Sequence, residues 1–214
     1  QRQMCIRDRQ RTGSYHNYYK MINNPFNKIN FLFLNNYYYH APCINFNEIE
    51  DIVNTYTEDD IDNDNFDWGN NCDMDRTPVR NSNILPLISD NFKAFADEVG
   101  AKVKAKLWEP WLNTYKKAQY QDVHDHAEHY FAAVIFMNEG VDFAKLYFMD
   151  RQKSFSPPFI QNVFQMDDVW YPHVGKGDII TFPGHMLHGV SPHKNDEIRK
   201  TLSLNIDVIE AQLL

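Results

Sequence analysis

The 214-residue sequence lacks paired cysteines, an excess of positive charge and long hydrophobic runs, and each absence excludes a class of protein. Its three cysteines, at positions 5, 43 and 72, are scattered without C-x-x-C spacing, so we expect no disulfide framework or zinc ribbon and a reduced, cytoplasmic setting. The net charge of −8 argues against non-specific binding of nucleic acid. No apolar run approaches the roughly 20 residues that a membrane span requires.

The sequence also lacks an internal repeat and a clear linker, which predicts a single domain. Residues 1–12 have no apolar periodicity and no hydrophobic segment typical of a signal peptide, and we expect a non-native or disordered leader there. Residues 13–214 are enough for one well-packed domain. Within it we expect helical and N-terminal support over residues 13–107 and a β-rich core over residues 108–210.

The first half of the chain contains one predicted strand and two predicted helices. The apolar run 29–34 predicts a strand, and the apolar spacing over 47–56 predicts a helix. A second helix is expected to start after Ser89-Asp90-Asn91 and to bury a stripe that extends to Val103. The segment 58–75 is dense in Asp and Asn, so we expect a solvated surface loop there.

Short apolar segments separated by turn residues dominate the second half. Strands are predicted over residues 129–137, 143–148, 160–164, 179–182 and 201–208. Clusters of Pro, Gly, Asn and Asp separate them. Many short strands without intervening helices predict a barrel or a double-sheet jelly roll. The expected fold class is therefore mainly β, with the two upstream helices packed on the outside of one sheet.

Three histidines and one arginine carry the clearest chemical signal. His124 and His126 alternate around Asp125 in a predicted strand, so their side chains share a face. An imidazole from the distant His188 would complete one face of a metal's coordination sphere and leave positions open for a ligand and oxygen. Arg199 would then be a fixed cation suited to a small carboxylate. Each histidine alone is more often a surface or core residue, so the combination carries the prediction.

The last predicted strand alternates between polar and apolar side chains. Its polar face comprises Arg199, Thr201, Ser203, Asn205 and Asp207. Solvent is the usual environment for the polar face of an antiparallel strand. The interior of a barrel that holds a polar ligand is the alternative, and the placement of His188 and Arg199 near one mouth favours it.

From about residue 111 to residue 207 the chain resembles the Fe(II)- and 2-oxoglutarate-dependent dioxygenases, most of all the prolyl-hydroxylase-like members found in marine phages and bacteria. Four motifs carry the resemblance: Trp111-Leu-Asn-Thr-Tyr-Lys, Gln121-x-x-His124-x-His126, Gly177-Asp-Ile-Ile-Thr-Phe-Pro-Gly-His-Met-Leu-His188 and Arg199-x-Thr201-Leu-Ser-Leu-Asn205. The resemblance implies a double-stranded β-helix that uses Fe(II), 2-oxoglutarate and O2. It implies hydroxylation of a C–H bond in a peptide or small-molecule substrate, with succinate and CO2 as co-products, and a phage or marine bacterial source.

Residue roles also follow from the resemblance. By position, His124 and His188 are metal ligands, and Arg199 binds the C5 carboxylate of 2-oxoglutarate. The same comparison implies that Thr201, Asn113, Tyr115 and Asn205 contact the cosubstrate or support the site.

The chain departs from the family at the third metal ligand. Most of the family has Asp or Glu two residues after the first histidine, whereas this chain has His126. We therefore predict a three-histidine metal site, with Asp125 as the alternative ligand if it turns inward.

Two other functions remain open at this point. Three-histidine iron centres are known in cupin-type dioxygenases that do not use 2-oxoglutarate, and Arg199 would then have no particular role. A non-catalytic jelly-roll module, such as a virion or sugar-binding component, would not retain a metal on purification.

Overall fold

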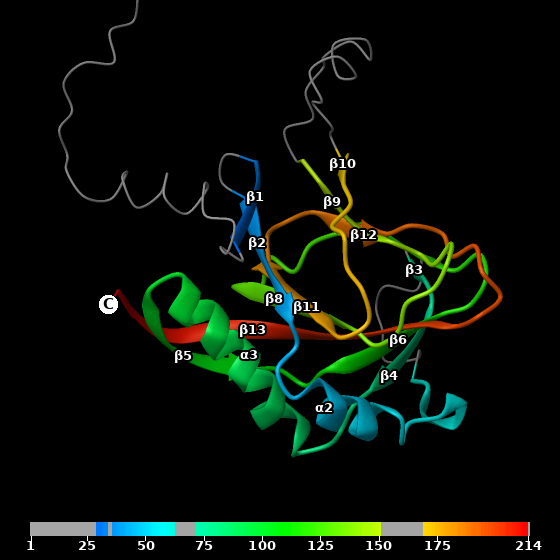
Figure 1. Ribbon diagram of the computed structural model, residues 1–214, viewed down its shortest axis with the longest axis horizontal. Helices are drawn as coiled ribbons and strands as arrows, with labels where there is room; N and C mark the ends of the chain where they lie inside the picture. Colours follow the sequence, from blue (N-terminus) through cyan, green and yellow to red (C-terminus); the bar gives the residue numbers. More distant parts are fainter. Residues whose placement is uncertain (1–28, 34–35, 63–71, 151–168, 214) are drawn as a thin grey trace, which may run out of the picture.

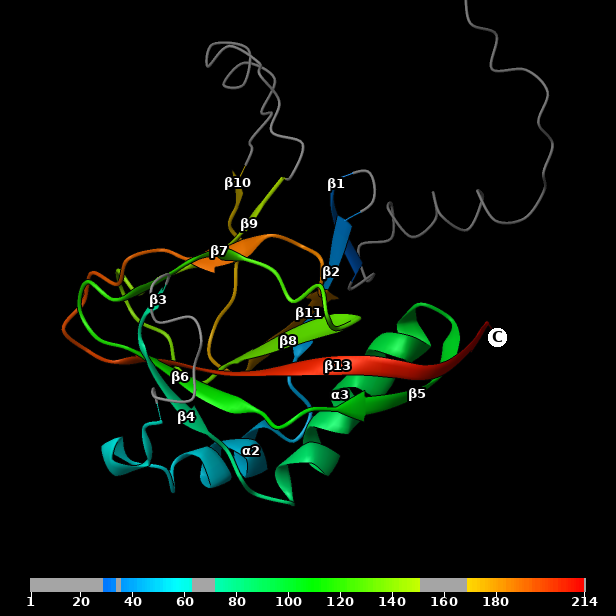
Figure 2. The same ribbon diagram turned by 180° about the vertical axis from the view of Figure 1, so that it is seen from behind.

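Two antiparallel β-sheets face each other, and helices cover the outer face of the larger one (Figures 1 and 2). The computed structural model describes residues 29–33, 36–62, 72–150 and 169–213. Within these residues the larger sheet runs in the order β1 (Ile29–Phe33), β2 (Asn36–Pro42), β11 (Asp178–Pro183), β8 (Phe131–Phe136), β13 (Arg199–Leu213), β6 (Trp111–Tyr115) and β4 (Asp75–Pro78), and β5 (Ala101–Leu107) pairs with β13. The smaller sheet runs in the order β10 (Val169–Trp170), β9 (Leu146–Met149), β12 (His188–Val190), β7 (Tyr120–His124) and β3 (Cys72–Asp73). This is the mainly β, double-sheet jelly roll that the sequence predicts.

The main hydrophobic core lies between the larger sheet and two helices, α2 (Phe46–Val53) and α3 (Ile84–Glu98). The apolar side chains of β13, Leu202, Leu204 and Ile206, belong to this core, at 0–1% exposure. Fully burying a side chain of this size stabilises a fold by about 1.5–3 kcal/mol. Because successive strand residues point to opposite faces, the polar side chains of β13 are turned toward the smaller sheet.

The second helix begins earlier and ends earlier than the sequence predicts. It starts at Ile84 rather than after Asn91, because Pro86 falls in the first turn, where a missing backbone N–H costs nothing. Gly100, with a φ of 71°, stops the chain from continuing as a helix. Val103, expected on the buried helix face, instead lies in β5.

The segment 58–75, predicted as a surface loop, is partly built into the sheets. It contains a single 3-10 turn, Glu58–Asp60, followed by β3 and the first residue of β4, while residues 63–71 lie outside the described part. The short strands β3 and β4 pair with β7 and β6, which satisfies their backbone groups despite the acidic sequence. The predicted strand 160–164 and the leader 1–12 also lie outside the described residues.

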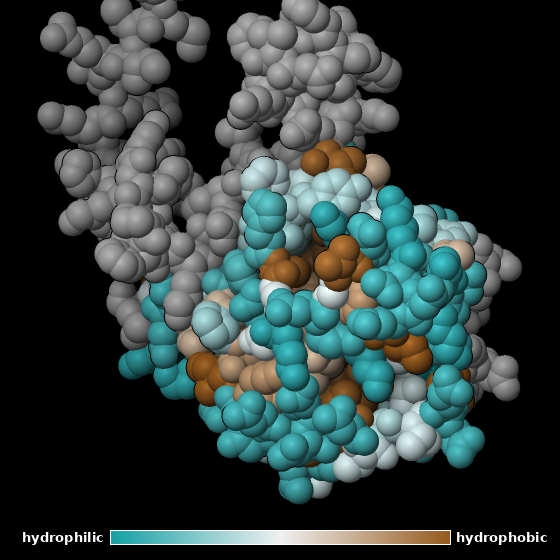
Figure 3. All heavy atoms as spheres, turned by 45° about the vertical axis from the view of Figure 1, so that its right-hand side comes forward, coloured by the Kyte–Doolittle hydropathy of each residue, from teal (hydrophilic) through white to brown (hydrophobic). Residues whose placement is uncertain are grey.

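The surface shown in Figure 3 is mostly hydrophilic, and its hydrophobic residues form small separate patches. None of the helices in the described part of the chain is long and apolar enough to cross a membrane.

Candidate metal centre and adjoining cavities

Two strands of the smaller sheet bring His124 and His188 together. His124 is the last residue of β7 and His188 the first of β12, and the two are direct partners in the antiparallel ladder. Their ring centroids are 4.2 Å apart. The ring of His126 lies 5.2 Å from that of His124 and 5.1 Å from that of His188. One ligand atom from each histidine lies within 4.8 Å of the others, an arrangement that can hold one metal ion.

Backbone carbonyls fix the tautomers of two of these imidazoles. The Nδ1 atom of His124 is 2.7 Å from the carbonyl oxygen of Asp122, and the Nδ1 atom of His188 is 2.9 Å from that of Met186. A carbonyl oxygen only accepts, so each Nδ1 carries the proton and each Nε2 keeps its lone pair. Histidines that bind metals are commonly oriented in this way.

His126 comes from a loop, and not from a strand as predicted. Strand β7 ends at His124, so strand alternation does not determine where His126 points. Its backbone N–H instead donates to the Gly184 carbonyl at 2.7 Å, and its carbonyl accepts from the His129 N–H at 2.8 Å. A Cβ atom at position 184 would lie 2.2 Å from the His129 oxygen and 2.6 Å from the His126 oxygen. Only glycine therefore permits this close approach of the two loops.

Burial keeps the three imidazoles neutral. Loss of hydration lowers the pKa of His124 and lowers that of His188 well below its ordinary value. Burial, followed by repulsion from His124, lowers the pKa of His126 to about 3. Neutral imidazole is the form that ligates metals, so at neutral pH no proton has to leave before a metal binds.

Arg199 is a buried cation that has no carboxylate partner in the described part of the chain. The residue is 3% exposed, and its guanidinium carbon lies 4.8 Å from the ring centre of Tyr115 and 5.8 Å from that of Phe136. Among the described residues its Nη1 atom has no hydrogen-bond partner and no carboxylate pairs with it. Burying an unpaired charge is costly, and the loss of hydration lowers the pKa of Arg199. A bound anion would remove this cost.

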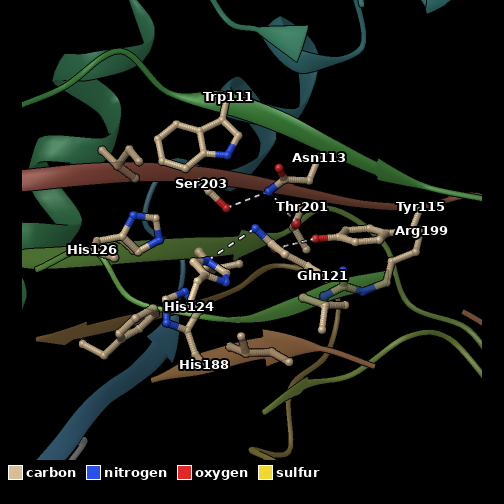
Figure 4. Close-up of a pocket in the computed structure, with 17 residues that line it drawn as sticks. Trp111, Asn113, Tyr115, Gln121, His124, His126, His188, Arg199, Thr201 and Ser203 are labelled. Carbon is tan, nitrogen blue, oxygen red and sulfur yellow. Dashed lines mark hydrogen bonds between the residues drawn. The ribbon is translucent and has the colours of Figure 1, made fainter. Parts of the chain in front are cut away.

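A polar wall connects Arg199 with the histidines. Figure 4 shows the histidines at one end of the pocket, Arg199 and Tyr115 at the other, and Asn113 and Thr201 between them. The Asn113 amide donates to Ser203 at 2.9 Å and to Thr201 at 3.4 Å, while its Oδ1 has no partner in the described part of the chain. The inward polar face of β13 is thus confirmed, with Arg199, Thr201 and Ser203 buried. The cavity between these residues measures about 30 Å³.

A larger space adjoins this pocket, and we call it the mouth cavity. It measures about 510 Å³ and shares His126, Trp111 and Gln121 with the first pocket. Asn205 lines the mouth cavity and does not line the pocket beside Arg199. Asp125 also lines it, and its Oδ1 accepts a hydrogen bond from the backbone of Ala127 at 3.2 Å. The structure therefore brings His126, and not Asp125, to the other two histidines.

Gln121 is a site residue to which the sequence analysis assigned no role. Its Oε1 accepts a hydrogen bond from the Tyr115 hydroxyl at 3.1 Å, and its Nε2 lies 3.4 Å from His124 Nε2. Burial raises the pKa of Tyr115 to about 12, so the phenol stays protonated and can donate. Gln121 thus connects the two ends of the pocket. The sequence feature that could have identified Gln121 as a site residue was its position in the motif, three residues before His124.

The residues of the pocket fit Fe(II) and 2-oxoglutarate. Neutral imidazoles suit a divalent transition metal, and three of them leave further positions for other ligands. The unpartnered Arg199 Nη1 donor suits a carboxylate at the far end of the pocket. The unpartnered Asn113 Oδ1 adds an acceptor on the wall between the two ends.

Comparisons with known proteins agree with this chemistry. Residues 109–205 match the family described as "Putative 2OG-Fe(II) oxygenase". An oxidoreductase of the 2OG-Fe(II) oxygenase family from Burkholderia pseudomallei has a TM-score of 0.58 and 12% identity, covering 94% of this chain and 93% of that chain. A viral collagen prolyl hydroxylase from Paramecium Bursaria Chlorella virus-1 has a TM-score of 0.53 and 12% identity, covering 79% of this chain and 94% of that chain. A prolyl-4-hydroxylase from Pseudomonas putida has a TM-score of 0.56 and 10% identity, covering 79% and 91%. These structures share the fold. No curated protein matches the sequence.

Proposed function

We propose that this chain, whose residues 109–205 match the 2OG-Fe(II) oxygenase family, hydroxylates a C–H bond of a peptide or a small molecule. In this class, 2-oxoglutarate and O2 are consumed, succinate and CO2 are released, and one oxygen atom enters the substrate. The enzyme class sets the cofactor, Fe(II), and the cosubstrate. The residues that bind them are our assignment.

We assign the metal to His124, His126 and His188. Supporting this assignment, their ligand atoms converge, and two of the rings present Nε2 because Nδ1 donates to a backbone carbonyl. When bound, the iron supplies the oxidising chemistry. The three histidines would hold it through their neutral ring nitrogens.

The observation that carries the assignment of 2-oxoglutarate is the buried, unpaired guanidinium of Arg199. We propose that it binds the C5 carboxylate, with Thr201, Tyr115 and Asn113 along the same wall. The rings of Tyr115 and Phe136 exclude water from this ion pair and so strengthen it. A three-histidine dioxygenase that does not use 2-oxoglutarate would leave this cation without a counterion, which disfavours that alternative.

Asn205 was predicted to contact the cosubstrate or support the site, but it does not line the pocket that contains the other predicted cosubstrate residues. It lies beside the mouth cavity with His126, on the substrate side of the proposed metal. Two structural neighbours are prolyl hydroxylases, so a peptidyl proline is one candidate substrate. The size of the mouth cavity is compatible with a peptide side chain.

We also propose that residues 13–214 form one domain in which residues 13–107 support the β-helix core, 108–210. The packing of α2 and α3 on the larger sheet supports this division. The free cysteines Cys43 and Cys72 support a cytoplasmic setting, either in a bacterium or, for a phage-encoded enzyme, in its host.

Labelled oxygen tests the proposed reaction. The protein, loaded with Fe(II) and given 2-oxoglutarate under ¹⁸O2, is expected to release succinate that carries one ¹⁸O atom, detected by mass spectrometry. An oxygen-consuming reaction that does not require 2-oxoglutarate would instead support the cupin-type alternative.

A further inference from the structure

The side chain of Gln121 connects Tyr115 with His124 across the pocket. Its Oε1 accepts a hydrogen bond from the Tyr115 hydroxyl at 3.1 Å, and its Nε2 lies 3.4 Å from His124 Nε2 (Figure 4). Because Nδ1 of His124 donates to the Asp122 carbonyl, Nε2 is the acceptor and the Gln121 amide is the donor. The amide therefore engages the lone pair that His124 needs for binding a metal.

Neighbouring strands on both sides hold the backbone of Gln121. The residue lies opposite Val190 of β12 and opposite Cys72 of β3 in the smaller sheet. A Cβ atom at position 189 would lie 2.9 Å from the Gln121 carbonyl oxygen, so β12 packs closely against this backbone. The side chain, and not the strand, is therefore the part of Gln121 that can leave His124.

Little space is left in the pocket while Gln121 crosses it. The cavity measures about 30 Å³, which is room for about one or two water molecules. A five-carbon dicarboxylate that extends from the histidines to Arg199 is larger than this, so a side chain of the lining has to move. Gln121 also lines the mouth cavity of about 510 Å³, into which its side chain can turn.

Tyr115 links this contact to the proposed carboxylate site. It lies opposite Arg199 in the pairing of β6 with β13, and its ring centre is 4.8 Å from the guanidinium carbon. Burial raises the pKa of Tyr115 to about 12, although the charge of Arg199 opposes this shift. The hydroxyl thus keeps its proton and has a single O–H to donate. A carboxylate bound by Arg199 would compete with Gln121 for that donor.

We infer that Gln121 is a positioning residue that couples metal binding to cosubstrate binding. Held by Tyr115, its amide competes with the metal for His124 Nε2. When the Tyr115 hydroxyl turns to a carboxylate at Arg199, Gln121 is held less firmly and releases His124, so metal binding is strengthened. Linkage requires that a bound metal strengthen binding of the carboxylate by the same factor. This inference rests on the proposed function and deepens it, because it adds regulation of the same site.

Titration with Co(II) alone, followed by visible absorption, tests the competition. Gln121→Leu keeps a similar side-chain volume without the donor, and Gln121→Asn keeps an amide that is one methylene too short to reach both partners. We expect each variant to bind Co(II) about two- to tenfold more tightly than the unaltered protein, since one hydrogen bond no longer has to be broken.

Gln119→Leu is the matched control for these two variants. Gln119 lies in the turn before β7, where its side chain bonds with the backbone of Lys116 and with Asp73, outside the pocket lining. We expect its substitution to leave the affinity for Co(II) unchanged. Equal or weaker binding of Co(II) by the Gln121 variants would overturn the inference.

Tyr115→Phe tests whether the two ends of the pocket are coupled, because phenylalanine cannot donate to Gln121. We expect this substitution to tighten Co(II) binding in the unaltered protein and to have no effect in the Gln121→Leu variant, where there is no amide to hold. The same effect in both proteins, or none in the unaltered one, would overturn the coupling.

The ¹⁵N NMR spectrum of the His124 ring in metal-free protein reports the contact itself. We expect the ring proton on Nδ1, and an Nε2 resonance that shifts when Gln121→Leu removes the donor. An Nε2 resonance that is the same in both proteins would also overturn the inference.

The two proposals fail separately. The Co(II) series needs no cosubstrate, so it tests the role of Gln121 directly. Binding of 2-oxoglutarate to the unaltered, Co(II)-loaded protein is measured in parallel, and its absence would count against the proposed function. Failure of the unaltered protein to bind Co(II) would overturn both.

Discussion

Arg199 lies directly opposite Tyr115 in the pairing of β13 with β6, and its guanidinium carbon is 4.8 Å from the centre of the tyrosine ring. The pair places a permanent cation beside an aromatic ring at the end of the pocket opposite the histidines. The ring shields the charge from water but cannot neutralise it, so an anion bound there would supply the missing counterion.

Arg199→Met is expected to separate stability from ligand binding. Replacing a buried, unpaired cation with an apolar side chain of similar length should leave the free energy of unfolding unchanged or raise it. The affinity for 2-oxoglutarate should fall by about 2–5 kcal/mol, because the variant leaves a buried carboxylate unpaired. Urea denaturation and calorimetry measure the two effects. Lys200→Met, at the neighbouring cation on the opposite face of β13, should leave binding unchanged, and equal losses in both variants would contradict the assignment.

His126→Ala and Asp125→Asn decide the third metal ligand. We expect His126→Ala to weaken Fe(II) binding by more than about tenfold, since one of three imidazoles is lost. Asp125→Asn should leave Fe(II) binding unchanged, because this side chain lies outside the histidine cluster. Anaerobic titration with Fe(II) measures both affinities. If Asp125→Asn weakens Fe(II) binding more than His126→Ala does, the metal ligands are two histidines and a carboxylate.

The stability of the metal-free protein should decrease as the pH falls below neutrality. The pKa of His126 is lowered from its ordinary value of 6.5 to about 3, and those of His124 and His188 are also lowered. Below pH 6.5 the unfolded chain therefore binds protons that the folded chain does not. Each such histidine removes up to about 1.4 kcal/mol of stability per pH unit, until the folded pKa is reached.

Urea denaturation of metal-free protein at pH 7.5 and at pH 5.5 measures this dependence. His126→Asn removes one titrating group and should flatten the slope relative to the unaltered protein. A slope that is the same in both proteins would mean that His126 is not held neutral by the fold.

Gly184→Ala is expected to displace the loop that carries His126. The new Cβ would meet the backbone oxygens of His126 and His129, which cannot move independently of the loop. We expect a loss of about 1–3 kcal/mol in the free energy of unfolding, as for other overpacked sites, together with weaker Fe(II) binding. In the control, Gly175→Ala, the Cβ meets only the flexible end of Glu139. Thermal denaturation and Fe(II) titration of both variants measure the difference.

The division of β13 into a polar and an apolar face could be predicted from sequence because strand alternation is a local rule. The apolar residues Leu202, Leu204 and Ile206 required a core, and Arg199 and Thr201 had to face the opposite side. The pairing of His124 with His188 could be expected only through the resemblance to a known family, because a register between strands so distant in sequence is set by the whole fold.

Other features depended on contacts that a sequence pattern does not contain. His126 is placed by hydrogen bonds of its loop to Gly184 and His129, and the strand alternation from which it was predicted does not apply there, because β7 ends at His124. The start of α3 was missed because Pro86 was not recognised as a first-turn residue. The contact of the His129 ring with Asp207, 78 positions later, also depends on the whole fold.

The most direct test of the central claim, that three histidines and Arg199 bind Fe(II) and 2-oxoglutarate together, is anaerobic absorption spectroscopy. Fe(II) is added first and 2-oxoglutarate second, and the weak visible charge-transfer band of the chelate is followed. We predict that the band appears in the unaltered protein, is lost in His188→Ala, and requires far more 2-oxoglutarate in Arg199→Met. A band that forms equally well in all three proteins would contradict the account.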